Sequence, residues 1–256
     1  MTQHRMRLLA LAAAVTLSGA ACGTTDAAAP LAPSGPQGRV RLVNLINDPA
    51  RLPVNAILER VPFGVNLGYT QTTPFTLAAP NNAPYAAVLA GARSIVLKRT
   101  ADTSVVVGTL AFTVNADQDK TIYAVGGVGG SAVTALETVD DNQTPGAGQV
   151  RVRFVNLSPT AGAVDVFITA AGADLAAATP AFTGVANRAA STYASVAAGT
   201  YMVRTVPTGT AAAARNGAVN ITLAAAAYPA LAARTFVAAE NTTGGAPLRL
   251  FGLTDR

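Results

Sequence analysis

Along most of this chain, short stretches of alternating apolar and polar residues are separated by turns rich in glycine and proline. Three stretches alternate or are rich in β-branched residues, which is typical of strands with one buried face: 40–42, 152–154 and 201–206. Further strands are predicted at 104–114, 120–127, 132–139, 217–223, 234–239 and 247–253. Roughly seven short strands in about 100 residues predict an immunoglobulin-like β-sandwich, with an up-and-down barrel as the structural alternative.

Two alanine-rich stretches, 170–190 and 224–233, are the least strand-like parts of the chain. Alanine has a high helix propensity, but Pro180, Gly184 and Pro229 interrupt both stretches. We therefore predict loops there and an all-β fold throughout.

An internal repeat divides the chain into two similar parts. The segment Arg39–Leu45 recurs as Arg151–Leu157 with six of seven residues identical, and Tyr85–Gly91 recurs in weaker form as Tyr193–Gly199. The matches keep their order along the chain, as a tandem duplication would produce. We define repeat one as residues 38–141 and repeat two as residues 148–256.

The predicted linker between the repeats, 142–147, has no apolar anchor and contains proline and glycine. Asp140, Asp141 and Asn142 are interpreted as part of a polar connection. Because each repeat carries its own set of strand signals, we expect two sandwiches with separate cores and only modest, polar contacts between them.

Residues 1–21 are predicted to be a signal peptide. His4, Arg5 and Arg7 give a positively charged start, and Leu8–Leu17 is an apolar segment of ten residues. A membrane-spanning helix needs about 20 apolar residues, so this segment fits an export signal better than a span.

The only cysteine, Cys22, follows the small residues that end the predicted signal peptide. The segment Leu17–Cys22 resembles a bacterial lipobox, in which the cysteine is acylated and becomes the new N-terminus; Gly19 stands where that motif usually has Leu, Val or Ile. Lipidation at Cys22 would attach the chain to a membrane through acyl chains such as palmitate. Residues 22–37 would then form a flexible tether, and Gly23 in place of Asp favours the outer membrane or cell surface. Ordinary cleavage without lipidation is the alternative.

The repeated motifs also resemble a known family. The pattern R-V-R-x-V-N-L-S-P at Arg151–Pro159, followed by A-V-D-V at Ala163–Val166 and by Tyr193 with Ala198–Arg204, is similar to domain of unknown function 4397. Repeat one matches less closely, with Asn55 where repeat two has Asp165. The resemblance implies a tandem, exported bacterial surface protein without an established activity.

Candidate chemistry is sparse. His4 and Cys22 are the only histidine and the only cysteine, and both fall in the predicted leader or its lipidation site. The three glutamates beyond it, Glu59, Glu137 and Glu240, show no paired spacing, so the sequence does not indicate an enzyme, a cofactor or a metal site. The formal net charge of +5 is dispersed along the chain rather than clustered, which argues against nucleic-acid binding.

Two loops and two tyrosines have competing interpretations. Residues 115–119 place oxygen-bearing side chains at alternate positions, as calcium loops do, but a solvated hairpin is favoured because Lys120 stands where a calcium loop needs glycine. The glycine-rich residues 126–130 are interpreted as another hairpin. Tyr85 and Tyr193 are interpreted as structural residues rather than stacking platforms for a ligand.

Together these features predict a non-enzymatic lipoprotein of the cell envelope with a structural, adhesion or interaction role. Its partners would be the membrane, through the lipid anchor, and a protein or glycan at the cell surface. A module that binds a small ligand or a glycan is the alternative, and a hydrolase that uses two carboxylates is the third hypothesis.

Overall fold

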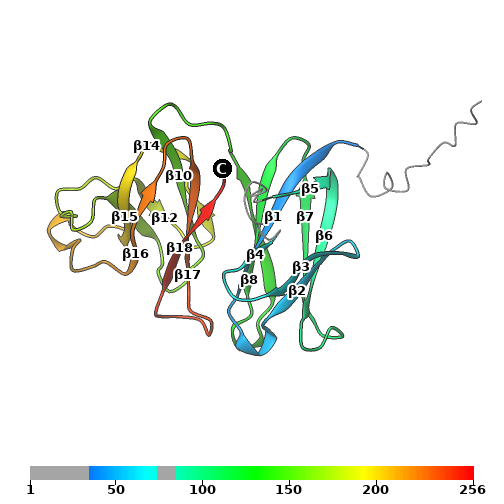
Figure 1. The fold of residues 1–256 in the computed structure, drawn as a ribbon. Helices are drawn as coiled ribbons and strands as arrows, with labels where there is room; N and C mark the ends of the chain where they lie inside the picture. Colours follow the sequence, from blue (N-terminus) through cyan, green and yellow to red (C-terminus); the bar gives the residue numbers. More distant parts are fainter. Residues whose placement is uncertain (1–34, 74–84) are drawn as a thin grey trace, which may run out of the picture. The chain divides into compact units, whose positions relative to one another are not determined.

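The computed structural model describes residues 35–73 and 85–256. The predicted signal peptide 1–21, Cys22 and most of the predicted tether lie outside the described residues. Ser34–Arg256 forms one compact unit. It is built from β-strands, which confirms the predicted all-β fold of two sandwiches (Figure 1).

The first sandwich consists of two sheets, in which most neighbouring strands are antiparallel. In one sheet, β1 (Gln37–Ile46) lies parallel to β8 (Asp119–Gly126), and β8 pairs with β9 (Val133–Asp140). Two short strands pair with the other edge of β1, namely β4 (Thr72–Thr73) and β5 (Ala86–Leu89). The second sheet has the order β3-β2-β6-β7, formed by β2 (Val54–Leu58), β3 (Val61–Leu67), β6 (Gly91–Arg99) and β7 (Val106–Val114).

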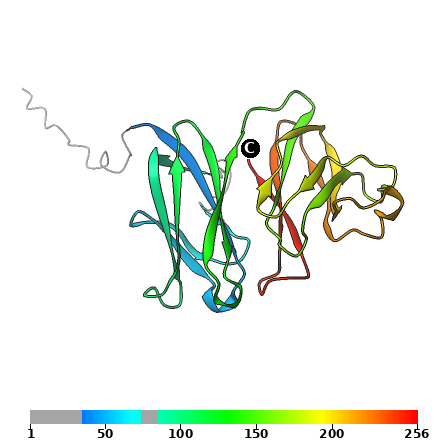
Figure 2. The same ribbon diagram turned by 180° about the vertical axis from the view of Figure 1, so that it is seen from behind.

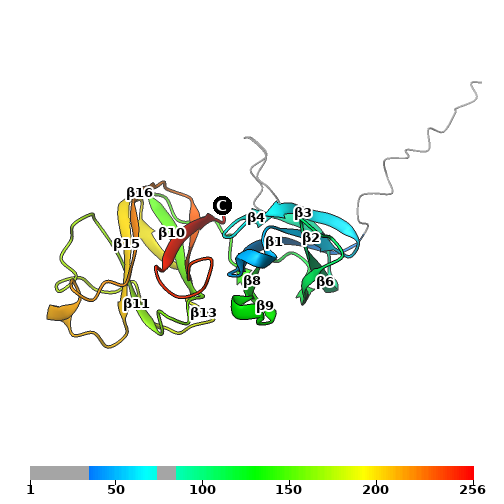
Figure 3. The same cartoon turned by 90° about the horizontal axis from the view of Figure 1, so that it is seen from below.

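The second sandwich repeats this topology. Its first sheet places β10 (Gln149–Asn156) parallel to β17 (Ala233–Ala239), next to β18 (Arg249–Thr254), with short partners β13 (Ala189–Ala190) and β14 (Ala194–Ala197). The other sheet has the order β12-β11-β15-β16, formed by β11 (Val164–Thr169), β12 (Phe182–Val185), β15 (Gly199–Pro207) and β16 (Ile221–Tyr228). Figures 2 and 3 show these strands from behind and from below.

The two copies of the R-V-R motif therefore lie on equivalent strands. Arg39–Leu45 belongs to β1 and Arg151–Leu157 to β10 and the residue after it, and each of these strands is the centre of a sheet with one parallel neighbour. This confirms the equivalence predicted from the repeat.

Helical structure is limited to three short 3-10 turns in the described part of the chain. They are η2 (Pro49–Arg51), η3 (Val128–Gly130) and η4 (Ala212–Ala214). None of the described helices has the length and apolar character needed to cross a membrane.

Three predictions about connections were wrong. The stretch 170–190 was predicted to be a loop, but it contains β12 and β13. The chain between β7 and β8, residues 115–118, is not a hairpin, because β7 pairs with β6 in one sheet and β8 pairs with β1 and β9 in the other. The alanine run 224–227 is not a loop, because β16 continues to Tyr228. Pairing with β15, including Tyr201 opposite Ala226, supplies the backbone hydrogen bonds that outweigh the weak strand propensity of alanine.

Each sandwich has its own apolar core. The first is formed by buried residues such as Leu42, Ile95 and Ile122, and the second by residues such as Phe154, Val166 and Phe236. This agrees with the expectation of separate cores. A third buried cluster, however, draws residues from both repeats: Val43, Leu45, Tyr123, Val155, Leu157, Val237, Ala239 and Leu253.

Candidate functional site: the joint between the repeats

Side chains on β1 and β10 alternate between two buried environments. In β1, Val40 and Leu42 belong to the core of the first sandwich, whereas Val43 and Leu45 belong to the third cluster. Successive side chains of a strand point to opposite faces, so the second arginine of each R-V-R motif lies on the same face as these last two residues. We call the surfaces that meet there the joint: the third cluster together with the polar groups beside it.

Arg41 crosses the joint from repeat one to the end of repeat two. Its guanidinium donates to Oδ1 of Asp255 at 2.7 Å and to the carbonyl oxygen of Thr254 at 2.8 Å. It also donates to Oγ1 of Thr121 in its own repeat, at 2.8 Å from Nη2. The side chains of Arg41 and Asp255 are 3% and 0% exposed, so this ion pair is shielded from water.

Arg153 makes the equivalent contacts in the opposite direction. Its guanidinium pairs with Asp140, the last residue of β9 in repeat one, and donates to the carbonyl oxygen of Val139 at 3.0 Å. Within its own repeat, Nε of Arg153 donates to Oγ1 of Thr235 at 2.8 Å. Each repeat thus contributes one arginine and one aspartate to two equivalent ion pairs, and a longer contact of 3.6 Å also joins Arg41 to Asp140.

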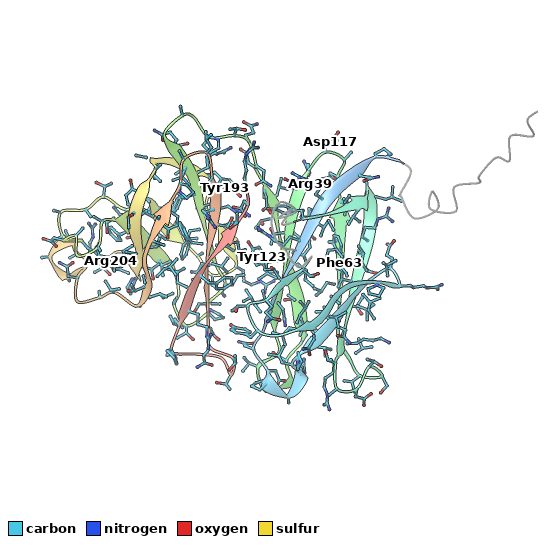
Figure 4. The ribbon with its side chains drawn as sticks, in the orientation of Figure 1. Arg39, Phe63, Asp117, Tyr123, Tyr193 and Arg204 are labelled. Carbon is cyan, nitrogen blue, oxygen red and sulfur yellow. The ribbon has the colours of Figure 1, made fainter. Side chains whose placement is uncertain are left out.

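Two tyrosines complete the arrangement. Tyr85 donates its hydroxyl to Oδ2 of Asp140 at 2.7 Å, and Tyr193 donates to Oδ2 of Asp255 at 3.1 Å. Each ring also lies under an arginine of its own repeat: the guanidinium carbon is 4.7 Å from the ring centre for Arg41 over Tyr85, and Arg153 lies over Tyr193 in the same way. Figure 4 labels Tyr193, just before β14. We call these side chains the clasp: Arg41, Tyr85, Thr121, Asp140, Arg153, Tyr193, Thr235 and Asp255.

The electrostatics of the clasp favour a fixed charge state. Burial by itself lowers the pKa of Arg41, but interactions with Tyr85 and with Asp255 raise it above its ordinary value. Both arginines therefore remain charged opposite their aspartates. Burial also raises the pKa of Tyr123, which lies in the third cluster, to about 12, and its hydroxyl has no hydrogen-bond partner among the described residues.

The clasp is suited to holding structure rather than to converting a substrate. Asp140 and Asp255 have side chains with 0% exposure, and each accepts hydrogen bonds from a tyrosine and a threonine in addition to its arginine. Carboxylates satisfied in this way are neither accessible nor in need of a ligand. Removing one partner of a buried ion pair costs about 3–5 kcal/mol, because the other charge stays buried without compensation, so the members of the clasp depend on one another.

The structure assigns roles to several residues singled out in the sequence. Tyr85 and Tyr193 are structural, as predicted. The interpretation of Asp140 as part of a polar linker was wrong, because Asp140 ends β9 and is buried in the joint. The expectation of polar contacts between the repeats was incomplete, because the third cluster adds apolar contacts to the ion pairs. Asp141 does lie in the connection, where it forms a more exposed ion pair with Arg151.

Other candidate sites contribute less. Cys22 lies outside the described residues. Within residues 35–73 and 85–256, no group of three or more His, Cys, Asp or Glu side chains is placed to hold a metal ion. In the loop that resembled a calcium site, Asn115 donates to Gln118 at 2.9 Å, and Asp117, labelled in Figure 4, has a left-handed backbone with φ of 59°.

A pocket of about 260 Å³ lies at the other end of the joint, lined by both repeats. Leu45, Leu157 and Ala239 are among its apolar lining residues. Glu240, which also lines it, accepts hydrogen bonds from the backbone of Thr160 at 3.0 Å and of Gly245 at 2.9 Å. Burial acts to raise the pKa of Glu240, but a hydrogen bond from the Thr160 hydroxyl, together with the two backbone hydrogen bonds, lowers it below its ordinary value, so the group is a carboxylate at neutral pH.

Comparison with known proteins places the chain in a family. A family model described as a domain of unknown function, DUF4397, matches residues 38–167, which is slightly more than half of the chain. The chain belongs to the DUF4397 family. The DUF4397 match includes Arg41, both motif copies and the complete Arg153–Asp140 pair, so it extends across the linker rather than stopping at the end of repeat one.

Other comparisons add little to the DUF4397 assignment. No curated protein matches the chain. Among solved structures, a leucine-rich repeat protein from Bacteroides thetaiotaomicron is 14% identical, with a TM-score of 0.19; the match covers 78% of this chain and 26% of that one. A likeness at this level does not indicate a shared fold.

Proposed function

We propose that this DUF4397 protein is a non-enzymatic, lipid-anchored protein of the bacterial envelope with a structural, adhesion or interaction role. The observation that carries the proposal is the buried clasp. The charged and aromatic side chains that both repeats have in common are used to hold the sandwiches together. Two sandwiches fixed in this way present loops in a constant arrangement, which suits recognition of a protein or glycan.

The anchor part of the proposal rests on Cys22 and the segment before it. Metabolic labelling with palmitate should mark the wild-type chain and leave a Cys22→Ser variant unlabelled. A substitution of the residue that directly follows the cysteine, Gly23→Ala, serves as the control and should keep the label. Equal labelling of the wild type and Cys22→Ser, or a mature N-terminus beyond Cys22, would contradict the anchor.

The interaction role requires a test on cells. Envelope retention and attachment to glycan-coated surfaces should be compared for cells that produce the wild type, Cys22→Ser or no chain. We expect the wild type to stay with the envelope and increase attachment, whereas Cys22→Ser should be released and lose the effect. Attachment that is identical in all three strains would argue against an adhesion role.

Binding of a small ligand is the second candidate function, and the pocket at the far end of the joint favours it. Besides its apolar walls, the pocket includes Asn47, whose buried Oδ1 has no hydrogen-bond partner within the part of the chain that the structure describes. A fitting ligand would be compact and mainly apolar, with one hydrogen-bond donor such as an alcohol or amine. Thermal shifts with a panel of such compounds should disappear in Val128→Trp, which places a large side chain among the lining residues; shifts that persist would place binding elsewhere.

A further inference from the structure

The joint presents nearly the same surface from both sides. Arg41 is equivalent to Arg153, Val43 to Val155, and Leu45 to Leu157, and each set faces the other repeat. Each repeat also contributes one threonine, one tyrosine and one aspartate to the clasp. This is the pattern of an isologous interface, in which the same patch is used twice around a two-fold axis.

The two surfaces differ at the position of Tyr123. By alignment of Thr121 with Thr235, Tyr123 corresponds to Val237, and both side chains are fully buried in the third cluster. A large residue in repeat one is thus matched by a small residue in repeat two. Pairing two copies of repeat one would bring two tyrosines into this space, whereas pairing two copies of repeat two would leave a void.

The linker that connects the two repeats does not belong to the joint. Repeat one ends with β9 at Asp140 and repeat two begins with β10 at Gln149, and the connecting residues include Pro145 and Gly146. The ion pairs and apolar contacts of the joint are complete without any requirement that both repeats belong to the same chain. Exchange of identical elements between copies is a low-cost route to dimers when such a connection joins them.

We infer that a second copy of this chain is a partner for the joint: repeat one of one copy closes on repeat two of another, and reciprocally. Tyr123 and Val237 select this unlike pairing over the pairing of like repeats. The surface that holds one chain closed is therefore also a surface for association between chains, in which both ion pairs are formed twice.

Charge reversal allows a direct test in the mature chain. One variant carries Arg153→Asp and Asp255→Arg, and the second carries Arg41→Asp and Asp140→Arg. Within either variant alone, like charges face each other across the joint. In a mixed dimer every arginine again faces an aspartate, because the reversed repeats match each other and the unreversed repeats match each other.

The two variants should be refolded from urea separately and together, then analysed by light scattering and thermal melting. We expect monomers of reduced stability, or unfolded chains, from separate refolding. Joint refolding should give a dimer with one copy of each variant and a melting midpoint at least as high as that of the wild type. Failure of the mixture to form this dimer would overturn the inference, and because refolding is joint, the test holds even if neither variant folds alone.

The size match provides the specificity test. Adding Val237→Tyr to both variants should weaken the mixed dimer at least tenfold, and adding Tyr123→Val as well should restore it, because large and small residues have exchanged places. In addition, wild-type chains with two different tags should form mixed-tag dimers when refolded together at high concentration. Absence of mixed-tag dimers, or no rescue by the double exchange, would contradict the selection of unlike repeats.

Discussion

Thr121 and Thr235 occupy equivalent positions on β8 and β17 and make the same two contacts. Each hydroxyl accepts a hydrogen bond from the arginine of its own repeat and donates one to the aspartate of its own repeat. That arginine meanwhile pairs with the aspartate of the other repeat. Each threonine therefore links the two ion pairs, so that loss of one partner weakens both sides of the joint.

Removal of one clasp arginine should destabilise the folded protein. We expect Arg153→Ala to lower the free energy of unfolding by about 3 kcal/mol, because Asp140 would stay buried with only the longer 3.6 Å ion pair to Arg41. Arg151→Ala is the matched control, two residues away on the same strand: it pairs with the more exposed Asp141 and should cost less than about 1 kcal/mol. Urea unfolding measures both values, and equal costs would show that the buried pair has no special role.

The tyrosine hydroxyls can be tested without changing the packing. Tyr85→Phe and Tyr193→Phe each remove a hydrogen bond to a buried carboxylate, so each should cost about 1.5–3 kcal/mol. Tyr201→Phe is the control, since its hydroxyl donates to the carbonyl of Ala197 in an exposed region. Phenylalanine variants as stable as the wild type would contradict the structural role of these hydroxyls and favour a role in ligand binding.

Alkaline pH should destabilise the protein before its arginines lose their charge. The pKa of Tyr123 is about 12 in the folded state and 10.0 in the unfolded state, so the folded state retains the proton longer. Stability is complete below pH 10 and falls as the pH rises toward 12, by up to about 1.4 kcal/mol per pH unit for this group. Unfolding by urea between pH 8 and 11.5 should show this fall, and Tyr123→Phe should reduce its slope. An unchanged slope would assign the effect to other tyrosines.

Repeat two in isolation should fold, because it has its own core, but it should be less stable than the full chain. A fragment of residues 148–256 keeps its own core but exposes Val155, Leu157 and Val237 and leaves Arg153 without Asp140. We expect a β-type circular dichroism spectrum, a lower melting midpoint than the full chain, and binding of a hydrophobic dye. A fragment that melts like the full chain and binds no dye would mean that the joint contributes little.

The sequence predicted the strands whose signals are local, but β2, β3, β11 and β12 were not predicted. Alternation around Val40 and Val152, together with the repeat, was enough to place β1 and β10 on equivalent positions. The run Ala224–Ala227 was missed because alanine has little strand propensity and the pairing with β15 comes from the tertiary fold.

The clasp could not be predicted from local pattern. Arginine at an alternating position of a strand normally faces solvent, and Arg41 and Arg153 are buried only because carboxylates distant in sequence meet them. One signal was available: Asp140 ends the last strand of repeat one and Asp255 directly follows the last strand of repeat two, so the duplication extends to the acids. Recognising that match would have linked each arginine to an aspartate of its neighbour.

The direction of the strands gives the joint two different ends. The chain enters β1 at Gln37, beside the clasp, and both β1 and β10 run from the clasp toward the pocket. At that far end the loop containing Val128 from repeat one lies against Gly244 of repeat two, where an added Cβ would come within 2.8 Å of a valine methyl group. The end of the joint farthest from the clasp is thus a composite surface that neither repeat forms alone.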